Sequence, residues 1–180
     1  RRSSDLNAWT KYDKRSIRMK CRARYGAAKL DVPLFNGFDR GVLARASFDE
    51  LDFRSGSQDM YERGFYMAGR FVEDTMLDMG SLNPHGRFVH LYLNGVYWGQ
   101  YDCRELLVEH FLADYLGGAA EDYVNVRGND NVGDDFVLGT PDPPHLQPWE
   151  QARSARNSYQ TLKTSVDISH LIDCMLLWNS

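Results

Sequence analysis

A basic strand near the start of the chain could bind a phosphorylated ligand. Its cationic positions are Lys14, Arg18, Lys20 and Arg22. Arg18 and Lys20 alternate with Ile17 and Met19, and a strand of this period turns its basic and apolar side chains to opposite faces. An arginine fork and a lysine point charge on one face suit a polyphosphate. The alternative is a solvent-facing strand that makes ordinary salt bridges, and spacing alone favours it.

Two other segments combine reactive side chains with suggestive spacing. Residues 97–105 form an aromatic run that ends at Glu105, and Gly99 would let a flat group such as a purine approach the backbone. The alternative is a core hairpin with Glu105 as a negative charge at a helix start. Residues 54–59 could bind an anion before a helix or form an ordinary capping turn. Spacing favours the structural interpretation of residues 97–105 as well.

Several kinds of chemistry are excluded by missing motifs. The sequence has no P-loop, no G-x-G-x-x-G, no H-E-x-x-H and no H-R-D or D-F-G pair. Cys21, Cys103 and Cys174 lie too far apart for a structural zinc site, and we assign no metal ligands. The formal net charge of -4 argues against a nucleic-acid partner. No apolar run approaches the roughly 18 residues of a membrane span.

The elements that must position these residues follow a mixed α+β order. The strongest local signal is Asn94-Gly95 between two strand-like runs, because this pair is preferred in two-residue hairpin turns. Gly80 and Gly117 are expected to end helices. The predicted elements are strand 15–25, a short strand at 48–53, helix 59–79, hairpin 88–101, helix 105–116, strand 123–127, loop 128–148, helix 149–164 and a helix from about 168 that is capped by Asp167 or Ser169.

Three of these segments together resemble the CotH family, named for spore coat protein H. Residues 14–21 resemble its K-x-S-x-R-x-K-F strand, and residues 53–59 resemble its L-R-[SN]-G-x-x-D turn. Residues 88–105 resemble its Y-x-N-G-x-Y-x-G-x-Y-x-x-x-E hairpin. The order and spacing agree, and the resemblance runs from about residue 3 to residue 178.

The resemblance implies an α+β, atypical protein-kinase-like fold that phosphorylates Ser-rich proteins with ATP and Mg²⁺. The N-lobe sheet with its helix would occupy residues 1–128, a linker residues 129–148 and the first C-lobe helices residues 149–180, all in one domain. Arg18 and Lys20 would hold the nucleotide phosphates, and Glu105 would lie beside the adenine in the segment that joins the lobes. The resemblance also implies a spore coat, cell-surface or secreted location.

The sequence departs from the family pattern in two places. Cys21 replaces a frequent Phe, which is conservative for a core face. The family's catalytic and metal-binding carboxylates follow the helix that matches residues 168–178, so we expect them beyond Ser180 and expect these 180 residues alone to be inactive. The alternative function is a non-catalytic coat or surface module, or a carbohydrate-associated one. The coat or surface module would use the aromatic hairpin for protein contacts. In the carbohydrate-associated module, Trp98, Tyr97 and Tyr101 would stack on sugars.

Overall fold

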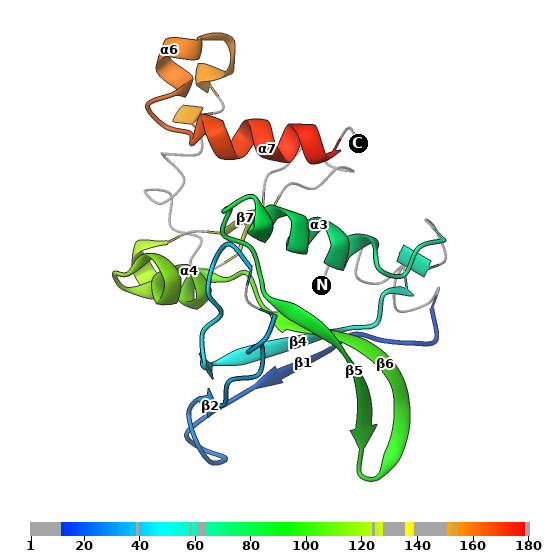
Figure 1. Ribbon diagram of the computed structural model, residues 1–180. Coiled ribbons are helices and arrows are strands. Elements are labelled where there is room, and N and C mark those ends of the chain that lie inside the picture. Colours follow the sequence, from blue (N-terminus) through cyan, green and yellow to red (C-terminus); the bar gives the residue numbers. More distant parts are fainter. Residues whose placement is uncertain are drawn as a thin grey trace. The chain divides into compact units, whose positions relative to one another are not determined.

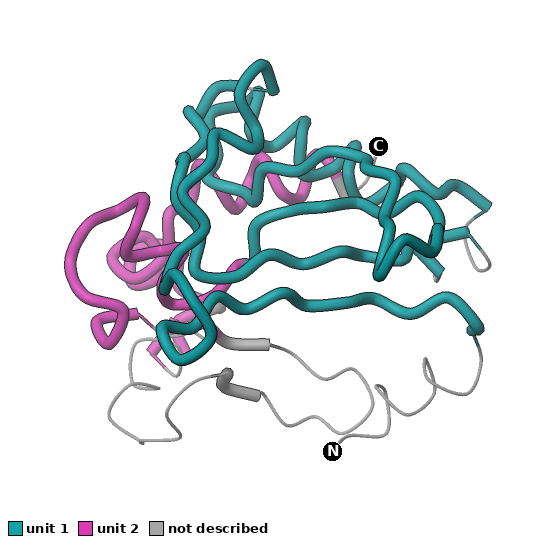
Figure 2. Tube along the Cα trace, turned by 90° about the horizontal axis from the view of Figure 1, so that it is seen from below, with its two compact units in different colours: residues 1–106 teal, residues 107–180 magenta. Residues whose placement is uncertain are grey.

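The computed structural model divides into two compact units, Arg1–Leu106 and Leu107–Ser180 (Figure 2). This boundary lies before the end of the predicted N-lobe segment 1–128, and the correspondence between units and kinase lobes stays a prediction. The structure describes residues 12–38, 40–57, 59–60, 64–123, 125–127, 136–138, 151–152 and 154–178. No helix among these residues is long and apolar enough to cross a membrane.

The first unit is built on a four-stranded antiparallel sheet whose strand order is β1-β4-β6-β5 (Figure 1). Its strands are β1 (Ile17–Lys20), β4 (Glu50–Arg54), β5 (Gly86–Leu93) and β6 (Val96–Glu105). Helix α3 (Ala68–Asp78) comes between β4 and β5 in the chain. The short strands β2 (Leu30–Asp31) and β3 (Ser47–Phe48) pair separately.

One face of the large sheet carries the hydrophobic core of this unit. Leu51 of β4 and Cys103 of β6 pack with Phe35 and Phe48 from the segment between β1 and β4. Phe35 and Phe48 meet edge to face, with ring centroids 5.3 Å apart. The residues that complete this cluster are Met19, Leu30, Leu34, Ala44, Phe53 and Val89. The prediction that Ile17 and Met19 lie on the apolar face of their strand is therefore confirmed.

Asparagine and glycine form the hairpin turn between β5 and β6, and glycine ends helix α3. Asn94 and Gly95 have φ of 50° and 79°, the left-handed values that a type I′ hairpin turn requires. Gly80 has φ of 84° after α3. Its N–H donates to Leu77 O and the Ser81 N–H donates to Met76 O, both at 2.9 Å, which is a Schellman motif. The turn and the helix end were both predicted correctly.

Three predicted elements of the first unit have different bounds. The strand expected at 15–25 is confined to β1, and the strand expected at 48–53 is divided between β3 and β4. The helix expected at 59–79 is interrupted, because Gly64 has φ of 66°, a left-handed value incompatible with a continuous α-helix. Glu105 ends strand β6 rather than beginning a helix; the helix starts four residues later.

The second unit contains short helices and a two-stranded sheet. Its elements are α4 (Glu109–Leu116), η1 (Ala120–Asp122), β7 (Asn125–Arg127), β8 (Phe136–Leu138), η3 (Ala155–Asn157), α6 (Tyr159–Leu162) and α7 (Ile168–Trp178). Strand β8 pairs with β7 and lies within the predicted loop; most of that loop is outside the described residues. Ser158 adopts an extended conformation and separates η3 from α6, which breaks the helix predicted at 149–164.

Two end signals of the second unit are confirmed. The Asp167 carboxylate accepts the backbone N–H of His170 at 3.1 Å, as an N-cap of α7 does. This hydrogen bond lowers the pKa of Asp167, and the His170 ring adds to the effect. Gly117 ends α4 with φ of 84°.

Candidate functional site

The second face of the large sheet is charged, and we call it the charged face. The strand register aligns Arg18 with Asp52 and Asp52 with Arg104 in one row. Residues opposite each other on antiparallel strands point to the same side. The residues of the charged face are Arg18, Lys20, Glu50, Asp52, Arg54, Asp102 and Arg104. The structure therefore places Arg18 and Lys20 on one face, as predicted, and adds charges from β4 and β6.

Helix α3 contributes three more charges to this face. Arg70 is almost fully buried; its Nη1 lies 3.0 Å from Glu73 and its Nε 2.7 Å from Asp74. Its remaining terminal nitrogen donates to Pro84 O at 2.8 Å. The approach depends on Gly86, because a Cβ there would lie 2.1 Å from Arg70 Nη1.

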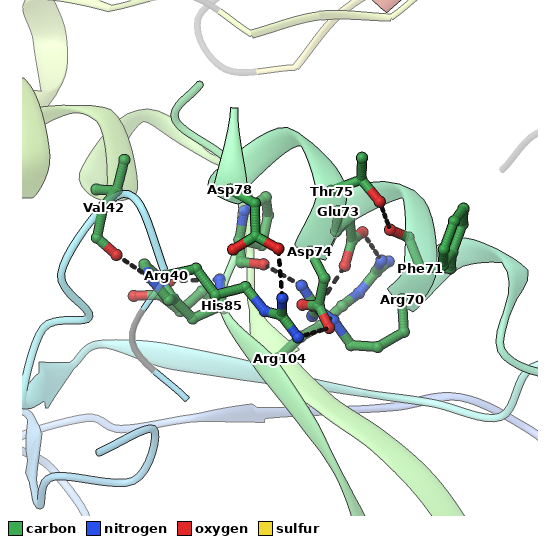
Figure 3. A network of polar contacts seen from close by, with 12 residues as sticks. Arg40, Val42, Arg70, Phe71, Glu73, Asp74, Thr75, Asp78, His85 and Arg104 are labelled. Carbon is green, nitrogen blue, oxygen red and sulfur yellow. Dashed lines mark hydrogen bonds and ion pairs between the residues drawn. The ribbon is translucent and has the colours of Figure 1, made fainter. Parts of the chain in front are cut away.

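Arg104 joins the helix to the sheet in the middle of this network. Its guanidinium forms an ion pair with Glu73 of α3 and lies 3.6 Å from Asp52 of β4. Figure 3 shows Arg104, Glu73 and Arg70 converging from the sheet and the helix. Burial raises the pKa of Glu73, although Arg104 and Arg70 oppose this effect. The network is thus a set of mutually compensated charges in a poorly hydrated place.

Asp102 is a buried carboxylate of the charged face. Only 6% of its surface is exposed, and its buried Oδ1 accepts no hydrogen bond among the described residues. Burial raises its pKa, while Arg70, Arg104 and Arg54 pull the pKa down through their charges. The three arginines also pair with Asp59, Glu73, Asp74 and Asp52, so their charges are shared among several carboxylates.

The basic residues predicted at β1 differ in their availability. Arg18 is exposed and makes no ion pair within the described part of the chain. Lys20 Nζ lies 2.9 Å from Glu50 on the neighbouring strand. Lys14 is occupied elsewhere: it donates to Gln100 O, and its Nζ lies 4.4 Å from the centre of the Tyr101 ring. Burial lowers the pKa of Lys14. Arg18 is therefore accessible to a ligand, as is the exposed Arg22 after β1, whereas Lys14 and Lys20 already have partners.

The Glu105 carboxylate does not share a site with Arg18 and Lys20. Glu105 stands opposite Leu51, which pairs with Met19, so its side chain points to the core face. Only 4% of Glu105 is exposed, and its Oε2 accepts the His85 backbone N–H at 2.8 Å. The prediction of Glu105 as a helix-start charge is wrong, because a residue of β6 must follow the strand's alternation.

The polar side chains of the turn between β4 and α3 bind to other groups of the protein. Asp59 is 3% exposed, and its carboxylate lies 3.0 Å from Arg54 Nη2. Ser55 and Ser57 join hydroxyls at 2.8 Å, and Ser57 donates to Lys14 O at 2.7 Å. These contacts hold the segment before β1 against the turn after β4, which favours the structural interpretation of residues 54–59 over anion binding.

Comparison with known protein families identifies the family to which this chain belongs. The family model described as CotH kinase protein matches residues 10–174. The chain belongs to the CotH kinase family. No curated protein and no solved structure matches it. The family suggests ATP and Mg²⁺ dependence in general terms.

The described residues of this CotH domain are better suited to binding ATP than to binding Mg²⁺. Arg18 is an exposed guanidinium fork, which suits nucleotide phosphates. Within the described ranges, however, no group of three His, Cys, Asp or Glu side chains could hold a metal ion. We therefore assign no Mg²⁺ ligand among these residues.

Sequence reasoning missed the charges that complete the face. Asp102 and Arg104 alternate with Cys103, so the predicted hairpin could have placed them on one side. On α3, Glu73 and Asp74 follow Arg70 at helical spacing. Both signals were present, but the pairing of Arg104 with Glu73 depends on the packing of α3 on the sheet.

Proposed function

We propose that this chain is the nucleotide-binding part of a CotH-family protein kinase. It would act in ATP- and Mg²⁺-dependent transfer of a phosphoryl group to Ser or Thr of a protein such as a coat or surface protein. A spore coat, cell-surface or secreted location is part of the same proposal. The observation that carries it is the charged face, where Arg18 and Lys20 of β1 lie in the same sheet surface as the arginines held by α3.

The connection between helix and sheet supports a kinase in particular. Protein kinases need an ion pair between a strand cation and a carboxylate of the helix beside the sheet. Arg104 of β6 and Glu73 of α3 form such a pair here. The helix enters the chain between β4 and β5, and the strand order β1-β4-β6-β5 places Arg104 in an interior strand. A change in α3 would therefore move a cation of the charged face.

The residues have distinct roles in this proposal. Arg18 binds phosphate oxygens directly through its exposed fork. Lys20 contributes after exchanging its partner Glu50 for the ligand, which reduces its net gain. Glu105 contributes by position: its carboxylate is buried, so the adenine would lie beside the backbone where β6 ends. Phosphoryl transfer needs this kind of positioning and electrostatic stabilisation more than covalent participation by the protein.

The test is phosphoryl transfer by the full-length protein from labelled ATP to a Ser-rich acceptor. Arg18→Ala should raise the KM for ATP by about tenfold or more, since hydrogen bonds to charged groups contribute about 1.5–3 kcal/mol. Lys20→Ala should have a smaller effect. Arg24→Ala is the matched control, because Arg24 is exposed in the turn after β1 and stacks on Tyr25. No transfer, or an Arg18→Ala variant equal to the parent, would contradict the proposal.

A second candidate function is the non-catalytic binding module, and the end of the hairpin favours it. Tyr92, Val96, Tyr97 and Trp98 are each at least 51% exposed. The Tyr92 and Tyr97 rings lie tilted with centroids 5.1 Å apart, and Tyr97 OH contacts His90 Nδ1 at 2.8 Å. Tyr101 is only 1% exposed, so the prediction that it would stack on sugars is wrong. Under this function, Trp98→Ala would abolish binding to a coat protein or polysaccharide. Thermal stabilisation by ATP would argue for the kinase instead.

A further inference from the structure

His85 lies at the point where the ends of β5 and β6 meet. It is 1% exposed and directly precedes β5. Its backbone and that of Glu105 are paired, since Glu105 N–H donates to His85 O at 2.9 Å. The ring then makes two contacts: Nδ1 lies 2.9 Å from Glu105 Oε2, and Nε2 lies 2.7 Å from Val42 O. One imidazole thus joins the last residue of β6 to a distant segment.

That segment, residues 40–42, is attached to α3 as well. Arg40 lies 3.1 Å from Asp74 and 2.5 Å from Asp78. A Cβ on Gly41 would lie 2.2 Å from Leu77 O, so the two backbones touch. Figure 3 shows Arg40 reaching Asp74 and Asp78 while Val42 O faces His85. A continuous set of contacts therefore runs from α3 through residues 40–42 and His85 to the end of β6.

The chemistry of the two acceptors decides the state of the ring. A backbone carbonyl can only accept a hydrogen bond, and an ionised carboxylate can only accept. Nε2 therefore carries a proton toward Val42 O. Glu105 Oε2 already accepts the His85 backbone N–H, so it faces Nδ1 as an acceptor and Nδ1 carries the second proton. The ring is then an imidazolium, and its pairing with Glu105 satisfies the requirement that a buried charge has a partner.

We propose that His85 is a positioning residue that, as an imidazolium, fixes the end of β6 against the segment held by α3. The carboxylate of Glu105 serves this pairing instead of binding a ligand. This positioning role has one consequence for function, which rests on the proposed kinase activity. The nucleotide would bind most tightly while His85 is charged.

The surrounding charges set the direction of the pH dependence. Burial would lower the pKa of His85, but the hydrogen bonds to Glu105 and Val42 and the charge of Glu105 raise it above its ordinary value. Arg70 of α3 opposes this increase. A folded-state pKa above the unfolded value means that the stabilisation is complete below about pH 6.5 and is lost as the pH rises through the folded-state pKa.

The first test needs no nucleotide. In the full-length protein with ¹⁵N-labelled histidine, both ring nitrogens of His85 should remain protonated to a pH above that of an unperturbed histidine. His85→Gln should remove the resonance and identify it. A neutral ring at pH 6, or titration below about pH 6.5, would overturn the proposal.

The second test measures unfolding in urea between pH 5 and pH 9. The parent should lose stability relative to His85→Gln as the pH rises, and Glu105→Gln should abolish this difference. His90→Gln is the matched control, because His90 is exposed on the same hairpin. Parallel profiles for the parent and His85→Gln would contradict the role of the charged ring.

The third test uses ATP as the probe. The Kd for ATP should rise by about fivefold or more from pH 6 to pH 9 in the parent and should change less in His85→Gln. If the parent binds no ATP at any pH, the kinase proposal fails, while the two preceding tests still decide the role of His85. If ATP binds with the same pH dependence in both proteins, the positioning role is wrong.

Discussion

The two faces of the large sheet are built from the same strands but are stabilised differently. On the core face, Leu51 and Cys103 are buried among apolar side chains. On the charged face, Arg70 of α3 is buried, and the half-buried Arg104 and Glu73 compensate each other's charge beside it. The core face depends on volume and tolerates approximate shapes, whereas the charged face depends on complete pairing. A single deletion on the charged face leaves an unpaired ion in a poorly hydrated place.

Among the substitutions that test this difference between the faces, Arg70→Met should cause the largest loss of stability. This change keeps most of the side-chain volume but removes the buried guanidinium that Glu73 and Asp74 share, so that among the described residues Glu73 keeps only Arg104 and Asp74 keeps only Arg40. We expect a loss of about 3–5 kcal/mol in the free energy of unfolding, as for other broken buried pairs. Urea unfolding followed by circular dichroism measures it. Arg24→Met is the control and should change stability by less than about 0.5 kcal/mol; an equal loss in both variants would show that the network has no special role.

The corresponding change on the core face is Leu51→Ala. Leu51 is 1% exposed and belongs to the central cluster, so its truncation should cost about 2–4 kcal/mol through lost burial and a cavity. The same unfolding measurement applies, and the loss should be nearly independent of salt. Leu43→Ala is matched in chemistry, but Leu43 is 74% exposed and should have little effect. Strong salt dependence for Leu51→Ala would contradict the distinction between the faces.

The smallest effect is expected at the open edge of the charged face. Lys20→Gln removes an ion pair with Glu50 in which the lysine side chain is 46% exposed. Its cost should be at most about 1 kcal/mol and should disappear at high salt. A loss as large as that of Arg70→Met would mean that the edge and the centre of the charged face form one cooperative network. Comparing the two variants at low and high salt distinguishes these cases.

Several features of the fold were predictable because they depend on neighbouring residues. The alternation of Ile17 and Met19 with Arg18 and Lys20 set the two faces of β1, and the Asn94-Gly95 pair set the hairpin turn. The position of Arg18 and Lys20 on one common face follows from the same short-range rule. The role of these two residues in nucleotide binding stays a prediction.

Other features could not be predicted because local signals allow more than one outcome. Gly64 and Gly69 have the same helix propensity, yet Gly64 is left-handed and breaks the helix while Gly69 lies inside α3. Glu105 satisfies the pattern of a helix start, but pairing with His85 keeps it in the strand. In both cases contacts with distant residues decide between conformations whose intrinsic energies are similar.

The sequence by itself determined the turns and the face to which each strand residue points, because these depend on φ preferences and on the two-residue period of a strand. Only the tertiary structure decided which charges meet. Arg104 lies 31 residues from Glu73 along the chain, and His85 lies 43 residues from Val42. Those pairings depend on strand register and on the close approach of α3 over Gly86, neither of which is encoded in local spacing.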